Sequence, residues 1–256
     1  MAFTTLHTAL GPSPTLTAAC CLNHTHDAVQ LARIVSSSVA PGPVLDVGCG
    51  TGGVAIPLLR ARPDVTVTGV DVSSARGALA TERAVLYGVA GRFRLVLGDV
   101  FAASLPAARS VVANPPMLPT EPGFSFPSRR GDEELFGTRL VRHLAARPDV
   151  ADIWLHLFDF HGVGRRSGRF PTIEEVAASE GYEVSYPHRG WRACGPDSAI
   201  RGAIPALRRL FPEGRAVIAG QELQFADLPP APASPLLIEH SIVRLNRAPT
   251  HHGDRK

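Results

Sequence analysis

Val44-Leu45-Asp46-Val47-Gly48-Cys49-Gly50-Thr51-Gly52-Gly53 is the stretch of sequence that decides the fold. An apolar run rich in valine leads into four glycines that are interrupted only by Cys49 and Thr51. Glycine lets a backbone turn tightly and approach a ligand without a Cβ in the way. A helix that starts behind such a turn offers free N–H groups and a partial positive charge. The stretch therefore predicts a strand, a ligand-binding loop and a helix, in that order.

Short apolar runs alternate with helical stretches from residue 44 onward. This alternation is typical of a parallel sheet covered by helices, so we expect an α/β fold. Local end signals support the helices: Ser73 or Ser74 as an N-cap with Gly88 as a stop, and Thr172 with Glu175 as a capping box ended by Gly181. The expected strands are 44–47, 65–70, 93–97, 110–113 and 153–158, and the expected helices include one with Ala78, Leu79, Val85 and Leu86 at helical spacing and one at 134–146.

Two regions fall outside this alternation and set the expected domain organisation. We expect an N-terminal helical segment over residues 1–40 and a main domain over residues 41–256. Gly- and Pro-rich segments in residues 187–233 indicate an insertion, which we interpret as a substrate lid. The elements expected here are a helix at about 25–35, a helix-like stretch at 199–210 and a final strand pair at 236–238 and 242–245.

Composition excludes several classes of protein. Hydrophobic residues make up 45% of the 256 residues, which suffices for a substantial core and argues against wholesale disorder. A net charge of +3 does not suit a protein that coats nucleic acid. Cys20, Cys21, Cys49 and Cys194 have no zinc-ligand spacing, so we expect neither a disulfide scaffold nor a metal site.

No segment predicts membrane attachment. The N-terminus lacks a basic region followed by an apolar core, and no apolar stretch approaches the roughly 20 residues that span a bilayer. We expect a cytoplasmic protein.

The glycine loop alone fits two cofactors. Gly48, Gly50 and Gly53 satisfy the GxGxxG fingerprint of dinucleotide sites, and Asp71 follows at a plausible distance for a ribose contact. Asp46 discriminates between them, because a carboxylate two residues before the first glycine would repel a pyrophosphate. It suits a ligand whose amino acid tail carries an ammonium group.

Asp46, Gly48, Gly50 and Gly52 resemble the acidic-x-Gly-x-Gly-x-Gly motif of class I S-adenosylmethionine-dependent methyltransferases. The resemblance implies a Rossmann-like α/β fold with a seven-stranded, mostly parallel sheet and helices on both faces. It also implies S-adenosylmethionine as the cofactor, held in part by the loop that contains Cys49.

Two further segments resemble the same family. Residues 65–71 read as a strand that ends in Asp71, and the family's acid at this point accepts hydrogen bonds from both ribose hydroxyls. Gly98-Asp99-Val100-Phe101 resembles the segment whose acid receives the adenine amino group and whose apolar neighbours flank the ring. The resemblance therefore implies cofactor contacts by Asp71, Val72, Asp99 and Val100.

Asn114-Pro115-Pro116-Met117 resembles the Asn-Pro-Pro-aromatic motif of amino-methyltransferases, and the resemblance ends here. That family includes enzymes acting on exocyclic nitrogens of adenine or guanine and on a glutamine amide of release factors. An amide or aryl-amine nitrogen is a poor nucleophile because its lone pair is delocalised. The Asn114 oxygen and a following backbone carbonyl can accept its two N–H bonds, and Pro115 and Pro116 stiffen the loop. Asn114, which also borders the cofactor site, and both prolines are the expected catalytic residues.

The substrate side departs from the motif at Met117, where the family usually has Tyr or Phe. Met can lie against a planar group through its polarisable sulfur, and Phe124 or Phe126 could supply a ring instead. Residues 186–191 follow a possible sixth strand, and Trp191 in this segment is the fourth candidate substrate residue. A substrate other than a nucleobase explains Met117 most simply, so we expect nitrogen methylation of a small molecule or peptide.

Three alternatives remain open. One is a ribosomal or transfer RNA base methyltransferase that uses arginines as phosphate contacts. Another is a protein glutamine methyltransferase, although the release-factor enzymes carry an N-terminal helical domain of roughly 70 residues, for which residues 1–40 are too short. The third is a cofactor-binding protein without catalysis.

Overall fold

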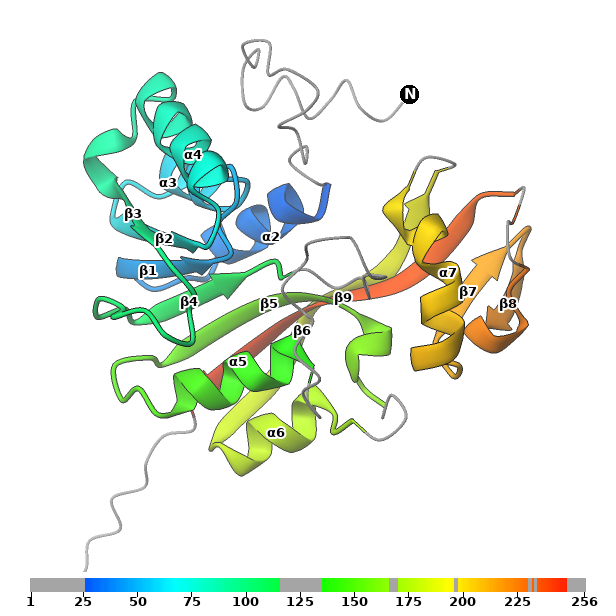
Figure 1. Cartoon of the computed structure of the whole chain (residues 1–256). Helices are drawn as coiled ribbons and strands as arrows, with labels where there is room; N and C mark the ends of the chain where they lie inside the picture. The colour runs from blue at the N-terminus through cyan, green and yellow to red at the C-terminus, as the bar shows by residue number, and fades with distance from the viewer. Residues whose placement is uncertain are drawn as a thin grey trace, which may run out of the picture. The chain divides into compact units, whose positions relative to one another are not determined.

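The computed structural model describes residues 26–115, 135–165, 170–195, 198–229, 232 and 234–247. The chain divides into two compact units, Met1–Ala108 and Arg109–Lys256. Strands and helices alternate in both units, which confirms the α/β class (Figure 1). None of the described helices is long and apolar enough to cross a membrane. The boundaries expected at residues 40 and 41, like the cytoplasmic location, stay predictions.

The first unit contains a parallel sheet in the order β3-β2-β1. Its strands end near the same edge, since Val47 pairs with Val70 and Asp71 pairs with Leu97. The loops after β1, β2 and β3 therefore gather at one edge of this sheet. The elements are α2 (His26–Ser36), β1 (Gly42–Val47), α3 (Ala55–Ala61), β2 (Val65–Asp71), α4 (Ser74–Leu86), a short 3-10 turn (Ala90–Arg92) and β3 (Phe93–Leu97).

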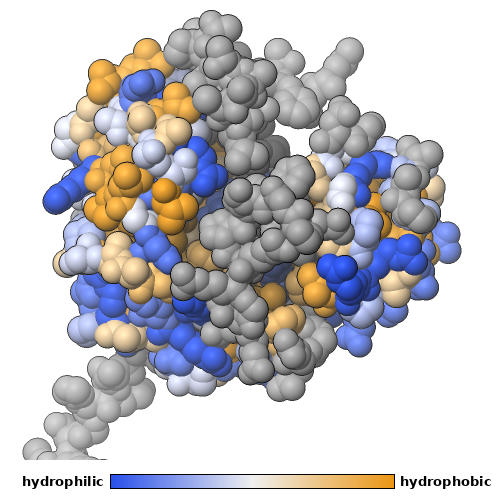
Figure 2. All heavy atoms as spheres, viewed as in Figure 1, coloured by the Kyte–Doolittle hydropathy of each residue, from blue (hydrophilic) through white to orange (hydrophobic). Residues whose placement is uncertain are grey.

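Helix α4 begins where the sequence predicts, but it buries a different face. Ser73 is the N-cap, and its side chain accepts a hydrogen bond from the Arg76 backbone N–H. Val85 and Leu86 are 65% and 54% exposed, whereas the buried positions are Gly77, Ala80, Arg83 and Ala84. A Cβ at Gly77 would lie 2.6 Å from Leu95 of β3, so the helix packs on the sheet through its smallest residues. Apolar side chains consequently remain on the face of the first unit seen in Figure 2.

The second unit is built around one long central strand, β9. Strand β4 pairs in parallel with β5, and β5, β6 and β7 each pair with β9 in antiparallel fashion. The hairpin of β7 and β8 completes the order β4-β5-β9-β7-β8. The elements are β4 (Ser110–Ala113), α5 (Phe136–Ala145), β5 (Asp152–Phe158), α6 (Ile173–Ser179), β6 (Tyr182–Cys194), α7 (Ala199–Leu210), β7 (Arg215–Ile218), β8 (Gln221–Gln224) and β9 (Leu236–Arg247), with 3-10 turns at Asp159–His161 and Phe225–Asp227.

The structure corrects the sequence prediction in three places in this unit. Residues 236–247 form one strand, not a strand pair, because His240 and Ser241 are buried and the Ser241 hydroxyl donates to the Asp159 carboxylate at 2.7 Å. Residues 187–194 belong to β6, so the segment between β6 and β9 begins later than expected. The described residues contain nine strands where seven were expected, since that segment adds β7 and β8 after α7.

Helix α6 shows the capping box that the sequence predicts. The Thr172 hydroxyl accepts from the Glu175 N–H at 3.0 Å, and the Glu175 carboxylate accepts from the Thr172 N–H at 2.9 Å. Helix α7 runs through Pro205 without a break and buries one face, including Ile204 and Leu207.

Candidate active site

The glycine loop after β1 adopts a conformation that side chains rarely allow. Gly48, Gly50 and Gly52 have φ values of +69°, +54° and +83°, in the left-handed region that favours glycine. The N–H groups of Gly48 and Cys49 donate to the Val70 carbonyl at 2.8 and 3.1 Å, which attaches the loop to the end of β2. The sequence places glycine where the turn requires it.

Asp71 joins the loop to the following helix. It is 5% exposed and ends β2. One carboxylate oxygen accepts from the Gly50 N–H at 2.8 Å, and the other accepts from the Ser73 N–H at 2.8 Å. The Arg76 guanidinium lies 3.4 Å away and balances the charge. Asp71 therefore presents a fixed carboxylate beside the glycine loop.

Asp46 is more deeply buried than Asp71. It is 1% exposed, and its Oδ2 accepts from the Ala55 N–H, at the start of α3, at 3.1 Å. Burial, with a smaller contribution from the negative charge of Asp71, raises the pKa of Asp46 to about 7. Burial likewise raises the pKa of the Cys49 thiol, so this thiol stays protonated and unreactive.

Arg83 of α4 forms hydrogen bonds to the glycine loop. This buried guanidinium donates from Nη1 to the Thr51 carbonyl at 3.2 Å and to the Thr51 hydroxyl at 3.0 Å. A buried cation needs such partners. Sequence reasoning missed Arg83, because nothing local distinguishes it from a surface arginine of an amphipathic helix.

The loops after β2 and β3 carry the remaining residues expected at the cofactor. Val72 is 53% exposed although it is apolar, whereas Val100 is buried. The Asp99 carboxylate accepts from the Phe101 N–H at 3.0 Å, which forms a tight turn after β3. An exposed valine next to Asp71 offers an apolar surface to a ligand.

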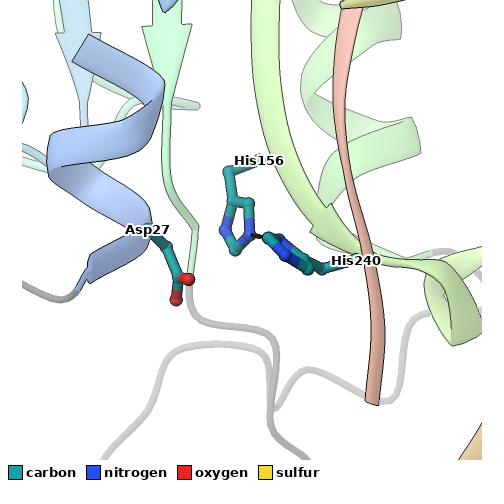
Figure 3. A group of neighbouring side chains, drawn as sticks. All are labelled: Asp27, His156 and His240. Atoms are coloured by element: carbon teal, nitrogen blue, oxygen red, sulfur yellow. Dashed lines mark hydrogen bonds between the residues drawn. The ribbon is translucent and has the colours of Figure 1, made fainter. Parts of the chain in front are cut away.

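In the second unit, Asn114 belongs to a chain of hydrogen bonds that the sequence did not reveal. Asn114 and the buried Pro115 follow β4 directly. The Asn114 Oδ1 lies 2.9 Å from His156 Nδ1, and His156 Nε2 lies 2.9 Å from His240 Nδ1. Figure 3 shows the two imidazoles with the bond between them. One sequence signal was available for His156, which interrupts the apolar strand Ile153-Trp154-Leu155-His156-Leu157-Phe158.

Comparison with known proteins identifies the segment that carries most of these features. Residues 44–114 match a family described as a methyltransferase domain. The match confirms the prediction of a class I S-adenosylmethionine-dependent methyltransferase domain in this part of the chain.

Two curated relatives share this domain over part of their length. The release factor glutamine methyltransferase of Cereibacter sphaeroides is 43% identical over 75 residues, which cover 29% of this chain and 27% of that protein. The ribosomal RNA small subunit methyltransferase C of Alcanivorax borkumensis is 40% identical over 76 residues, which cover 30% of this chain and 22% of that protein. The matched stretch thus spans about a quarter of the length of these relatives.

A solved structure confirms the Rossmann-like methyltransferase fold. A candidate RNA methyltransferase from Pyrococcus horikoshii superposes with a TM-score of 0.50 at 15% identity, covering 86% of this chain and 83% of that one. At this identity the likeness concerns the fold alone.

Several predicted residues of the methyltransferase domain and its substrate side are not described by the structure. Pro116, Met117, Phe124 and Phe126 lie outside the described residues. Trp191 lies on β6 and is 40% exposed, opposite Glu239 of β9. Glu239 in turn forms an ion pair with Arg165, which follows β5 in the chain, at 2.7 Å. The catalytic role of Pro116, the lid and the substrate roles of the other four predicted residues stay predictions: Met117, Phe124, Phe126 and Trp191.

We expect Asp46→Asn to alter the dependence of stability on pH. The pKa of Asp46 is about 7 in the folded protein against 3.8 for an unperturbed carboxyl. The folded state therefore keeps a proton that the unfolded chain releases, so this group's contribution to the unfolding free energy is fully present below pH 3.8 and lost as pH rises to about 7. The loss is about 1.4 kcal/mol per pH unit within that window.

Urea unfolding of both proteins at about pH 5 and about pH 8 measures this effect. Asp46→Asn lacks the titrating group, so its stability relative to the parent is expected to be higher at the upper pH. An equal difference at both pH values would contradict the assignment.

Proposed function

We propose that this chain transfers the methyl group of S-adenosylmethionine to a nitrogen atom of a small molecule or peptide. The observation that carries the proposal is the buried Asp71 carboxylate, fixed by Gly50 and Ser73 beside a left-handed glycine loop within the methyltransferase domain. A dehydrogenase becomes the weaker alternative, since the matching family is one of methyltransferases.

The described residues fit this cofactor. Each Asp71 oxygen accepts one backbone N–H, and a carboxylate oxygen has a further lone pair for a ribose hydroxyl. The exposed Val72 suits one face of an adenine ring. A Cβ at Gly48 would meet no heavy atom within 4 Å, so the loop has open space beside it for the amino acid tail. The cofactor supplies an activated methyl group on a sulfonium. Asp46, Gly48, Cys49, Gly50, Gly52, Asp99 and Val100 complete the proposed cofactor-binding set.

Asn114 is the proposed catalytic group for nitrogen. A carboxamide oxygen accepts two hydrogen bonds, and His156 Nδ1 lies at hydrogen-bond distance from this one. A second bond, from the substrate N–H, favours a tetrahedral geometry at the nitrogen. In this geometry the lone pair is localised on nitrogen and can attack the methyl group. No strong base is needed, because the proton on nitrogen can leave after methyl transfer.

Charge distribution favours a small molecule or peptide over RNA. Phosphate contacts require arginines that are not already neutralised. Seven arginines of the described residues are paired with carboxylates: Arg62 with Asp64, Arg76 with Asp71, Arg142 with Glu180, Arg147 with Asp149, Arg165 with Glu239, Arg215 with Glu222 and Arg244 with Asp152. RNA remains the second candidate substrate, and the glutamine side chain of a protein the third, since relatives of the domain carry those names. Strong salt dependence of substrate binding would favour RNA.

We expect Asp71→Asn to weaken binding of S-adenosylhomocysteine by about tenfold or more, because the ribose hydroxyls lose a charged acceptor. Calorimetry on the full chain measures the change. Asp64→Asn, directly before the start of β2 and paired with Arg62, is the matched control and should bind like the parent. Equal affinities of Asp71→Asn and the parent would refute the cofactor assignment.

We expect Asn114→Ala to retain S-adenosylhomocysteine binding and to lose about 100-fold in turnover, because a preorganised acceptor for the reacting nitrogen is gone. Methyl-labelled S-adenosylmethionine is incubated with fractionated cell extract, and the labelled product is identified by mass spectrometry and then used as the assay. Asn246→Ala on β9 is the control. Full turnover by Asn114→Ala would contradict the proposed mechanism. Label found only in RNA would contradict the proposed substrate class and favour RNA as the substrate.

A further inference from the structure

We propose that His156 and His240 are positioning residues for Asn114: His156 donates Nδ1–H to the Asn114 oxygen, and His240 fixes the tautomer of His156. This inference rests on the proposed function of Asn114. It adds two residues to the site that neither the methyltransferase motif nor the sequence spacing assigns.

The three residues come from three neighbouring strands of the second unit. Asn114 follows β4, whose last residue Ala113 pairs with Leu155 of β5. His156 is therefore the next residue along the partner strand. On the other side, Phe158 of β5 pairs with His240 of β9, so His240 lies diagonally across from His156. The sheet register thus holds all three side chains in place, and the two hydrogen bonds of 2.9 Å run across it.

The hydrogen bonds have a definite direction. An amide oxygen carries no hydrogen, so the bond between Asn114 Oδ1 and His156 Nδ1 requires a proton on Nδ1. A neutral His156 then has its lone pair on Nε2, and His240 Nδ1 must be the donor in the next bond.

The opposite tautomers would change what Asn114 offers to a substrate. If His240 Nδ1 accepted, His156 would carry its proton on Nε2 and its lone pair on Nδ1. The Asn114 carboxamide would then have to turn its NH2 group toward His156, which moves the oxygen away from its present position. The tautomer of the histidine pair therefore decides whether Asn114 can accept a substrate N–H.

Burial of the two imidazoles would destabilise the folded state if they did not form these hydrogen bonds. His156 is fully buried and His240 is 4% exposed, and an imidazole removed from water needs hydrogen-bond partners. The His240 ring also packs against His188 at 5.1 Å, and a Cβ at Gly190 would lie 3.1 Å from His188 Nε2. Packing from β6 thus restrains the imidazole at the end of the chain of bonds.

A fixed carboxamide should affect the chemical step more than binding. The bond from His156 Nδ1 fixes the orientation of the Asn114 carboxamide, and with it the direction in which the oxygen faces a substrate N–H. The reaction then does not have to restrict the rotation of the amide group. Loss of the His156 donor should lower kcat and leave the cofactor affinity unchanged.

Two substitutions of His156 separate this role from simple packing. His156→Phe keeps an aromatic ring but has no donor, whereas His156→Asn places an amide N–H at about the position of Nδ1. We expect His156→Phe to lose about tenfold or more in kcat with KM for S-adenosylmethionine unchanged, and His156→Asn to recover most of that loss. His143→Phe on α5 is the matched control and should keep the parent's kcat. Full kcat in His156→Phe, or no recovery in folded His156→Asn, would overturn the proposal.

Nitrogen NMR of the imidazoles tests the same proposal without activity. The full chain should show Nδ1–H tautomers for both His156 and His240, and Asn114→Ala should release His156 into a mixture of tautomers. A Nε2–H tautomer of His156 in the parent would overturn the positioning role even if methyl transfer is found. Failure to bind S-adenosylhomocysteine would instead overturn the proposed function.

Discussion

The hydrogen bond from the Gly50 N–H to the Asp71 carboxylate, at 2.8 Å, is the interaction on which the candidate cofactor site depends. It ties the loop after β1 to the end of β2, and the left-handed conformations of Gly48, Gly50 and Gly52 allow it. The other carboxylate oxygen holds the Ser73 N–H before α4. A carboxylate at position 71 therefore has a structural role as well as its proposed ligand role. The two roles are compatible because each oxygen keeps a lone pair.

Features that depend on neighbouring residues could be predicted from the sequence. The first five strands were placed within two residues of β1 to β5, because their apolar runs are bounded by turn residues. The caps at Ser73 and Thr172 were predicted because capping is a local interaction. The glycine loop was recognised because only glycine tolerates its backbone. The family match confirms that this part of the sequence identifies the domain.

Features that depend on distant residues could not be predicted. His240 and Ser241 read as a break between two strands, yet they lie inside β9 because their partners His156 and Asp159 stand more than 80 residues earlier. His156 reads as an isolated polar residue in a strand until Asn114, 42 residues before it, supplies the acceptor. Arg83 likewise needs Thr51 from another element. The catalytic motif thus marks Asn114, while the groups that orient it come from the tertiary structure.

Calorimetric titration of the full chain with S-adenosylhomocysteine and, separately, with NAD⁺ tests the central claim most directly. The glycine loop satisfies both cofactor patterns by sequence, and only the surrounding acids and the domain match separate them. Saturable binding of S-adenosylhomocysteine with no heat from NAD⁺ is the predicted result. Binding of NAD⁺, or of neither ligand, would contradict the account.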